Sequence, residues 1–417
     1  MDTKKNPMKH GFIGIGQGGG NILNSGFYKD FPVFVINTAQ TDLNNLKNIP
    51  NDCKYLTKIT DGGGAGKEIA IGERAIRENR DEIKKRLETL FKNCEYIWIV
   101  AGLGGGTGTL GAITMIEILT EMQVMHGIIG TVPLKHEGTV EKANCLIGLN
   151  QIYKASRKSF FFKGIILIDN KKLKDHIMDS GSFSYESLWD LANGEIYSQF
   201  KSIYEFTGQS GQTCLDLEDY KRIFKESGCM LFAEAEIDPS GKSEKSLALA
   251  VMEMWQNTFF LTGDILKGKA VGVVVERPKD FDTDGAMIDC LFTEIKDHFK
   301  AGLVCPGVYL SDLTLQETLK LKRKPVKIKV IVSGIPFPAT YLQSLSEETA
   351  KEIDIIKAKE AEEEDLEIDV DFAKGFLCKT SGPKPAQKID LAVFYGKQEE
   401  TWAVQWGGKN EKILSQQ

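Results

Sequence analysis

The sequence lacks the features that would mark a disulfide-rich, zinc-binding or membrane protein. Its eight cysteines form no CxxC pair, and its five histidines form no HExxH spacing. No uninterrupted run of eighteen apolar residues is present, and the N-terminal residues lack the apolar core of a secretion signal. We therefore expect a cytoplasmic protein with reduced thiols, no membrane contact and no metal site built from its own side chains.

Strong charge of one sign is also missing, because the formal net charge is only −6 over 417 residues. The negative charge is concentrated in residues 347–371, which hold twelve acidic residues and three lysines. This balance argues against a protein that coats nucleic acid directly. It leaves open a partner that itself binds DNA.

Strand-like and helix-like segments alternate through the first 180 residues. The strand-like runs are 10–16, 32–38, 96–102, 126–132 and 164–169, and a charged helix is expected over 67–91. This alternation predicts an α/β fold with a parallel sheet covered by helices on both faces.

The rest of the chain is less regular. We expect a long helix over 185–206, strands at 229–237, 270–276 and 327–334, helices near 243–260 and 283–300, and a charged helix over 340–364. The predicted division is a GTP-binding domain (1–184), a central helix with an acidic loop (185–215), a smaller α+β activation domain (216–336), a C-terminal helix (337–376) and a tail (377–417).

Glycine is abundant where the early strands end. The segments are 14–21 (GIGQGGGN), 61–67 (DGGGAGK) and 102–109 (GLGGGTGT), with Asn37-Thr38 after the second strand. Ligands bind at the carboxyl edge of an open parallel sheet. Glycine-rich loops let backbone N–H groups converge on an anion, and a helix N-terminus adds positive potential. The pattern predicts a polyphosphate ligand.

Other interpretations of the glycines are weaker. Gly14, Gly16 and Gly19 satisfy GxGxxG, but a dinucleotide-binding fold would place an acid where Asn37-Thr38 stands, and it would not explain the loop at 102–109. The GKS at 241–243 lacks the upstream glycine of a P-loop. A plain tight turn would need one or two glycines only.

Seven segments, in order, resemble the tubulin/FtsZ superfamily of GTPases. They are GFIGIGQGGGNILN, VINT, GGGAGKEIAIGERA, GLGGGTGT, LKHEG (134–138), IILIDNKKL followed by LANGEIY (191–197), and CLDLEDYKRIF (214–224). This resemblance covers about residues 10–335. It implies GTP or GDP with Mg²⁺ as ligands and assembly into filaments.

The resemblance also implies roles for particular residues. Gly104–Gly108 would wrap the α- and β-phosphates, Gly62–Ala65 would sense the γ-phosphate, Glu137 would reach the ribose, and asparagines would read guanine. The full nucleotide-binding set is Gly18, Gly19, Gly20, Asn21, Asn37, Gly62, Gly63, Gly64, Ala65, Gly104, Gly105, Gly106, Thr107, Gly108, Thr109, Glu137, Asn170 and Asn193.

Asp216 and Asp219 are the implied catalytic residues, supplied to the nucleotide of a neighbouring subunit. Their spacing at the start of a helix puts both carboxylates on one side. Capping of that helix explains the same residues without catalysis, and the two roles are compatible.

Two positions depart from the family pattern. Cys214 stands where the division proteins have asparagine, and Glu141 stands where they have a phosphate-facing arginine, with Lys142 adjacent. Both departures bear on the rate of hydrolysis rather than on the class of reaction.

Within the superfamily the chain looks most like TubZ, the bacterial tubulins that segregate plasmid or phage DNA. That resemblance implies head-to-tail self-assembly and a TubR-type DNA-binding adaptor at the C-terminal region, hence indirect contact with DNA. An FtsZ-like division GTPase and a non-hydrolysing filament or binding module are the alternatives. The acidic helix and the tail residues 391–395, Trp402 and Trp406 could serve a partner or pack within the chain.

Overall fold

A computed structural model describes residues 8–134, 136–179, 181, 183–205, 215–277, 285–299, 302–310 and 326–364. These residues form one ten-stranded sheet in the order β3-β2-β1-β4-β5-β6-β7-β10-β8-β9. The predicted α/β fold class is confirmed.

The first half of the sheet is entirely parallel. Its strands are β1 (His10–Ile15), β2 (Val33–Asn37), β3 (Lys54–Leu56), β4 (Tyr96–Gly102), β5 (His126–Val132) and β6 (Phe162–Asp169). Every residue of β1 and β2 is buried. Uniform burial is what a parallel sheet covered on both faces requires, and it explains the continuous apolar runs in the sequence.

Helices connect these strands. They are α1 (Gly16–Ile22), which continues through a π turn (Leu23–Phe27) into α2 (Tyr28–Asp30), then α3 (Gln40–Asn45), α4 (Ile69–Glu78), α5 (Arg80–Leu90), α6 (Gly106–Glu121), α7 (Thr139–Lys158) and α8 (Asn170–Asp179). Short 3₁₀ turns lie at Asn51–Cys53 and Lys58–Thr60.

The helix expected over 67–91 is broken into α4 and α5 at Asn79. The Asn79 side chain donates a hydrogen bond to the Ala75 carbonyl at 2.9 Å and accepts one from the Tyr55 hydroxyl at 2.8 Å. Its backbone leaves the helical region, with φ −103° and ψ 14°. Asparagine competes with helical hydrogen bonds in this way, so local sequence alone favours one long helix and the tertiary contact decides for two.

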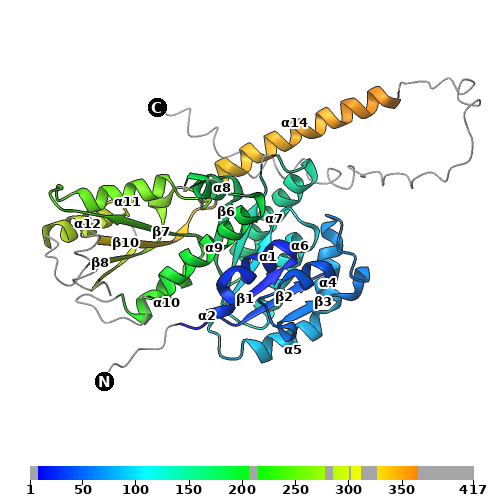
Figure 1. Ribbon diagram of the computed structural model, residues 1–417, viewed down its shortest axis with the longest axis horizontal. Helices are drawn as coiled ribbons and strands as arrows, with labels where there is room; N and C mark the ends of the chain where they lie inside the picture. The colour runs from blue at the N-terminus through cyan, green and yellow to red at the C-terminus, as the bar shows by residue number, and fades with distance from the viewer. Residues whose placement is uncertain are drawn as a thin grey trace, which may run out of the picture. The chain divides into compact units, whose positions relative to one another are not determined.

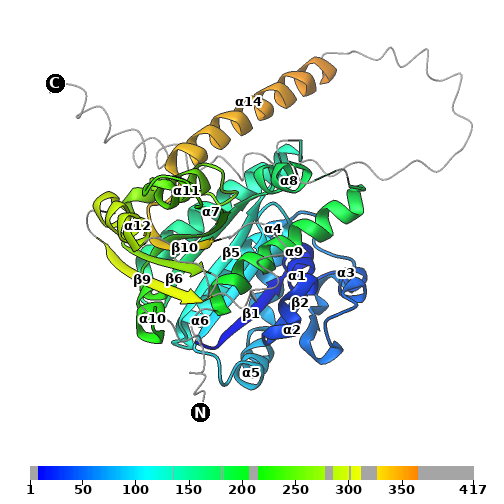
Figure 2. The same cartoon turned by 60° about the vertical axis from the view of Figure 1, so that its left-hand side comes forward.

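The second half of the sheet mixes directions. It contains β7 (Gly228–Ile237), β10 (Val326–Ile335), β8 (Ala270–Arg277) and β9 (Leu303–Leu310), with antiparallel pairing on both sides of β10. The sequence did not indicate β9, because Pro306 interrupts it. Proline lacks the N–H that a central strand needs, and β9 is the edge strand of the sheet (Figure 2).

In the part of this half that the structure describes, three helices and a 3₁₀ turn accompany the strands: α10 (Leu217–Lys225), α11 (Ser246–Gln256), α12 (Gly285–His298) and Ile265–Lys267. Helix α9 (Tyr185–Tyr204) lies between β1 on one side and β7 and β10 on the other (Figure 1). Only two residue pairs join β6 to β7, Gly164 with Gly228 and Ile165 with Cys229.

A buried histidine joins the two halves. The His10 side chain of β1 is only 1% exposed and lies among aromatic rings of α9 and α10, including Phe200 and Tyr220. It accepts a hydrogen bond from the Trp98 indole N–H at 3.2 Å, and its Nε2 lies 3.3 Å from the Tyr220 hydroxyl. Burial lowers the pKa of His10 to about 3, so the ring is neutral at physiological pH.

The described residues up to Lys357 form one compact unit. The five-part division at 184, 215, 336 and 376 stays a prediction, as do the roles of the tail, whose residues 377–417 lie outside the described part. The expected charged helix is present as α14 (Ala339–Glu364). None of the helices in the described ranges is both long and apolar enough to span a membrane.

Candidate functional site

The carboxyl ends of the parallel strands surround a cavity of about 550 Å³. Its lining comes from the segments that follow β1, β2, β4, β5 and β6, together with residues 63–67. The predicted site residues on its wall are Gly18, Asn37, Gly63, Gly64, Ala65, Gly104, Gly105, Gly106, Thr107, Gly108, Glu137 and Asn170. Segments far apart in the sequence therefore meet at one edge of the sheet, as a parallel sheet dictates.

The N-terminus of α6 opens into this cavity. Gly105 is the N-cap residue, and no side chain among the described residues caps the helix. The first N–H groups of a helix have no partner within the helix, and together with the helix dipole they attract anions. A Cβ on Gly105 would lie 3.9 Å from its nearest neighbour, the Gly102 carbonyl oxygen, so this glycine leaves open space at the helix end. The end of α6 is suited to a phosphate group.

The other glycines of this loop serve close packing. A Cβ on Gly108 would lie 2.5 Å from the Gly102 carbonyl oxygen, and one on Gly106 would lie 2.9 Å from the Glu68 backbone nitrogen. Gly72 of α4 approaches the same turn, because its Cβ would lie 2.2 Å from the Gly106 carbonyl oxygen. The glycine cluster therefore brings three backbone segments together and also leaves room for a ligand.

Polar side chains hold the loops in place. The Asn37 Oδ1 accepts hydrogen bonds from the backbone N–H groups of Thr38 (2.7 Å) and Ala39 (3.2 Å). The hydroxyls of Thr38 and Thr107 lie 2.7 Å apart and link the loops after β2 and β4. Asn37 therefore shapes its own turn as well as facing the cavity.

Asn144 of α7 has a similar bridging role that sequence reasoning did not identify. Its Nδ2 donates to the Lys67 carbonyl at 2.9 Å and to the Gly104 carbonyl at 3.1 Å. The side chain is 1% exposed, so these bonds form in a dry environment. Asn144 joins the two glycine-rich loops, and nothing in its sequence neighbourhood signals that role.

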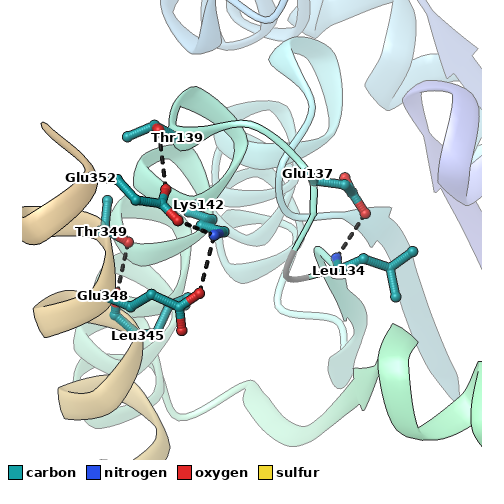
Figure 3. A network of polar contacts seen from close by, with 8 residues as sticks. All are labelled: Leu134, Glu137, Thr139, Lys142, Leu345, Glu348, Thr349 and Glu352. Carbon is teal, nitrogen blue, oxygen red and sulfur yellow. Dashed lines mark hydrogen bonds and ion pairs between the residues drawn. The ribbon is translucent and has the colours of Figure 1, made fainter. Parts of the chain in front are cut away.

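Charged side chains also line the cavity. Asp42, Glu137 and Glu141 contribute carboxylates, and Lys67 contributes an ammonium group that pairs with Glu141. The Glu137 Oε1 accepts a hydrogen bond from the Leu134 backbone N–H at 2.8 Å (Figure 3). The predicted site residues did not include Lys67 or Asp42. Their positions give a signal, because Lys67 is the last residue of the motif GGGAGK and Asp42 lies four residues after Thr38.

Lys142 does not take the place of a phosphate-facing arginine. Its side chain is 2% exposed and pairs with Glu348 (3.1 Å) and Glu352 (2.6 Å) on α14 (Figure 3). Burial lowers the pKa of Lys142, but the two carboxylates outweigh burial and raise it. Two acids of the C-terminal helix are therefore engaged within the chain rather than forming only a solvated face.

The remaining predicted nucleotide-binding residues lie off the cavity wall: Gly19, Gly20, Asn21, Gly62, Thr109 and Asn193. A Cβ on Gly19 would lie 2.1 Å from the Val100 carbonyl oxygen, which makes that glycine a packing residue. The Thr109 hydroxyl donates to the carbonyls of Leu103 and Gly105. Their proposed roles in nucleotide binding stay predictions.

Asp216 and Asp219 lie in the other half of the molecule. Asp216 is the N-cap of α10, and its Oδ1 accepts a hydrogen bond from the Asp219 backbone N–H at 2.8 Å. Asp219 lies 3.6 Å from the Arg222 guanidinium. Neither acid is among the described residues that line the cavity. Cys214 lies outside the described residues.

Comparison with known proteins identifies the domain that carries the cavity. Residues 10–178 match the model described as "Tubulin/FtsZ family, GTPase domain". This part of the chain belongs to the Tubulin/FtsZ family. The resemblance read from the seven motifs is confirmed.

Several relatives of that family align over much of the chain. The cell division protein FtsZ of Aquifex aeolicus is 26% identical, with 65% of this chain and 68% of the relative covered. The tubulin-like protein CetZ of Pyrococcus horikoshii is 26% identical, with 79% of this chain and 86% of the relative covered.

Solved structures of the family share the fold. A GTPγS-form protofilament of TubZ from Bacillus thuringiensis serovar israelensis has a TM-score of 0.71 at 18% identity, covering 85% of this chain and 94% of that one. The GDP-bound CetZ1 monomer of Haloferax volcanii has a TM-score of 0.65 at 19% identity, covering 82% and 99%.

Proposed function

We propose that this protein is a GTPase that assembles head to tail and hydrolyses GTP at the contact between subunits. One observation carries the proposal. The chain contains a glycine-lined cavity and two acids at the start of α10, Asp216 and Asp219. Neither acid is among the described residues that line the cavity of the same chain. A second copy that brings its α10 to the open cavity would complete the site.

The cavity residues would bind the nucleotide. The uncapped N-terminus of α6 and the backbone of Gly104 and Gly105 would meet the phosphates, while Glu137 and Asn170 would face the ribose and the base. The Asp42 carboxylate accepts hydrogen bonds from the amides of Gln17 (3.4 Å) and Asn37 (3.0 Å), neither of which cancels its charge. It suits a Mg²⁺ ion that also takes phosphate oxygens and water, and that ion would neutralise charge on the phosphates.

The chemistry requires an oriented water and a group that polarises it. Asp216 and Asp219 of the next subunit would position and polarise that water, and Asp216 would keep its capping bond while doing so. Assembly therefore creates the active site, and hydrolysis would weaken the contact that created it.

Phosphate release measured against protein concentration tests this proposal. With GTP and Mg²⁺ in excess, the rate per subunit should be low at low concentration and rise above a threshold as filaments form. A rate strictly proportional to protein concentration, with no threshold, would refute the shared site. Filaments that form with GTP but release no phosphate would favour the non-hydrolysing alternative.

The cellular role we propose is movement of plasmid or phage DNA in the cytoplasm. The fold shared with TubZ protofilaments supports this role. A TubR-type adaptor on the C-terminal region would connect the filament to DNA. The FtsZ relatives favour a second candidate, a role in cell division. Fluorescence microscopy of this protein fused to a fluorescent tag distinguishes the two roles. In DNA movement the fluorescence should follow a labelled plasmid, and in cell division it should form a band at midcell.

A further inference from the structure

The side chains that line the cavity carry more negative than positive charge. Among the described lining residues, three carry carboxylates (Asp42, Glu137 and Glu141), and Lys67 alone carries a positive charge. That one cation is paired with Glu141. A nucleotide with several negative charges would therefore meet a wall whose net charge is negative.

Lys67 lies on the cavity wall beside the N-terminus of α6. Its backbone touches the start of α6, because a Cβ on Gly106 would lie 2.9 Å from the Lys67 carbonyl carbon. The Lys67 carbonyl is also held by Asn144, which binds the Gly104 carbonyl as well. The lysine is thus fixed by its main chain at the anion-attracting end of the helix, while its side chain is 60% exposed and can move.

The backbone at Lys67 gives an independent indication. Its φ is +68°, in the left-handed region that long side chains rarely adopt. A glycine would adopt this conformation without strain, as the preceding Gly66 does at φ +56°. Strained backbone conformations of this kind cluster at ligand-binding sites, and Lys67 lies on the wall of the cavity.

We propose that Lys67 and Glu141 form a latch that the terminal phosphate of the nucleotide opens. Lys67 leaves Glu141 and pairs with the γ-phosphate, so it distinguishes triphosphate from diphosphate. Without the γ-phosphate the lysine returns to Glu141. The inference rests on the proposed function, because it assumes that a guanine nucleotide occupies the cavity.

The binding of GTPγS and of GDP to the full chain, with Mg²⁺ present, tests the latch. Lys67→Gly removes the charge and suits the left-handed backbone, so the variant should fold. We expect it to lose at least about tenfold in GTPγS affinity while GDP affinity stays within about twofold, since hydrogen bonds to charged groups are worth more than neutral ones. Lys67→Arg should restore the preference for GTPγS.

Glu141→Gln distinguishes the latch from a simple structural tether. The latch predicts that this variant binds GTPγS about threefold or more tightly than the wild type, because the competing carboxylate charge is gone. A tether predicts weaker binding of both nucleotides. Lys245→Ala is the matched control, since Lys245 is an exposed lysine paired with Glu294 at 3.0 Å on another helix.

The outcomes separate this inference from the proposed function. If the wild type binds neither nucleotide, the proposed function fails and the latch fails with it. If the wild type binds both and Lys67→Gly weakens both equally or neither, only the latch is overturned. Weaker GTPγS binding by Glu141→Gln also overturns it.

Discussion

The two halves of the sheet differ in the directions of their strands, and this difference decides where loops can meet. In the half from β3 to β6 all strands are parallel, so every carboxyl end opens at one edge and the loops there meet around one cavity. In the half from β7 to β9 strand directions alternate at β10, so strand ends are distributed over both edges. This difference explains why loops converge on a cavity only in the first half, whereas the two acids of the second half lie at the start of helix α10. The proposed function therefore places the complete site between two chains.

The largest expected effect concerns the acids of the second half. Asp216→Asn and Asp219→Asn should each reduce GTP turnover by at least about 100-fold while nucleotide binding persists, because in the proposed mechanism each acid polarises the attacking water through its charge. Asparagine is as good an N-cap as aspartate, so Asp216→Asn keeps the capping bond. Phosphate release and filament sedimentation with GTP measure the two properties.

Mixing two inactive proteins sharpens the same comparison. Gly105→Asp should cap α6 and place a negative charge in the phosphate site, where there is open space for it. Mixed with Asp219→Asn, it should restore part of the turnover, because each chain supplies the half that the other lacks. No recovery in filaments that contain both chains would contradict a site shared between subunits.

A glycine of the parallel half should be the most sensitive to added volume. Gly19→Ala places a Cβ 2.1 Å from the Val100 carbonyl oxygen, and we expect it to lower the free energy of unfolding by about 3 kcal/mol. Gly194→Ala in α9 is the control, since a Cβ there has nothing within 4 Å and alanine favours the helix. Urea unfolding of both variants measures the difference; equal effects would show that packing is not the cause.

The stability of the folded protein should decrease in acid because of two buried histidines of the parallel half, His10 and His126. Burial lowers the pKa of His10 to about 3 and that of His126 to about 4, from the ordinary value of 6.5. The unfolded chain therefore binds protons that the folded chain does not, and stability is complete above pH 6.5 and falls as the pH is lowered. His10 accounts for about 2 kcal/mol at pH 5, so His10→Phe should give a shallower decline between pH 6.5 and 5 in unfolding titrations.

The smallest expected effect is at the contact between α7 and α14. The hydrogen bond from Lys142 lowers the pKa of Glu352, so its contribution is present above the ordinary glutamate pKa of 4.5 and is lost as the pH falls below it. Because the glutamate is partly exposed, Glu352→Gln should cost at most about 1 kcal/mol at neutral pH. Thermal unfolding at pH 7 and pH 4 measures it; a larger loss at pH 4 than at pH 7 would contradict this account.

The sequence by itself determined the class of fold and the edge where the cavity lies. Regular alternation of strands and helices predicts a parallel sheet. Glycine-rich segments that follow successive parallel strands then meet at the carboxyl edge of that sheet. The predicted loops at 61–67 and 102–109 both reach the cavity for this reason.

Only the tertiary structure decided which way each side chain of those segments faces. Gly19 and Gly105 each lie in a glycine-rich segment of the sequence. In the structure Gly19 packs against the Val100 carbonyl, whereas Gly105 faces open space. Glu141 and Lys142 are adjacent, but successive residues of a helix point about 100° apart, so one lines the cavity and the other contacts α14. Such distinctions arise from contacts between distant segments, and no local pattern contains them.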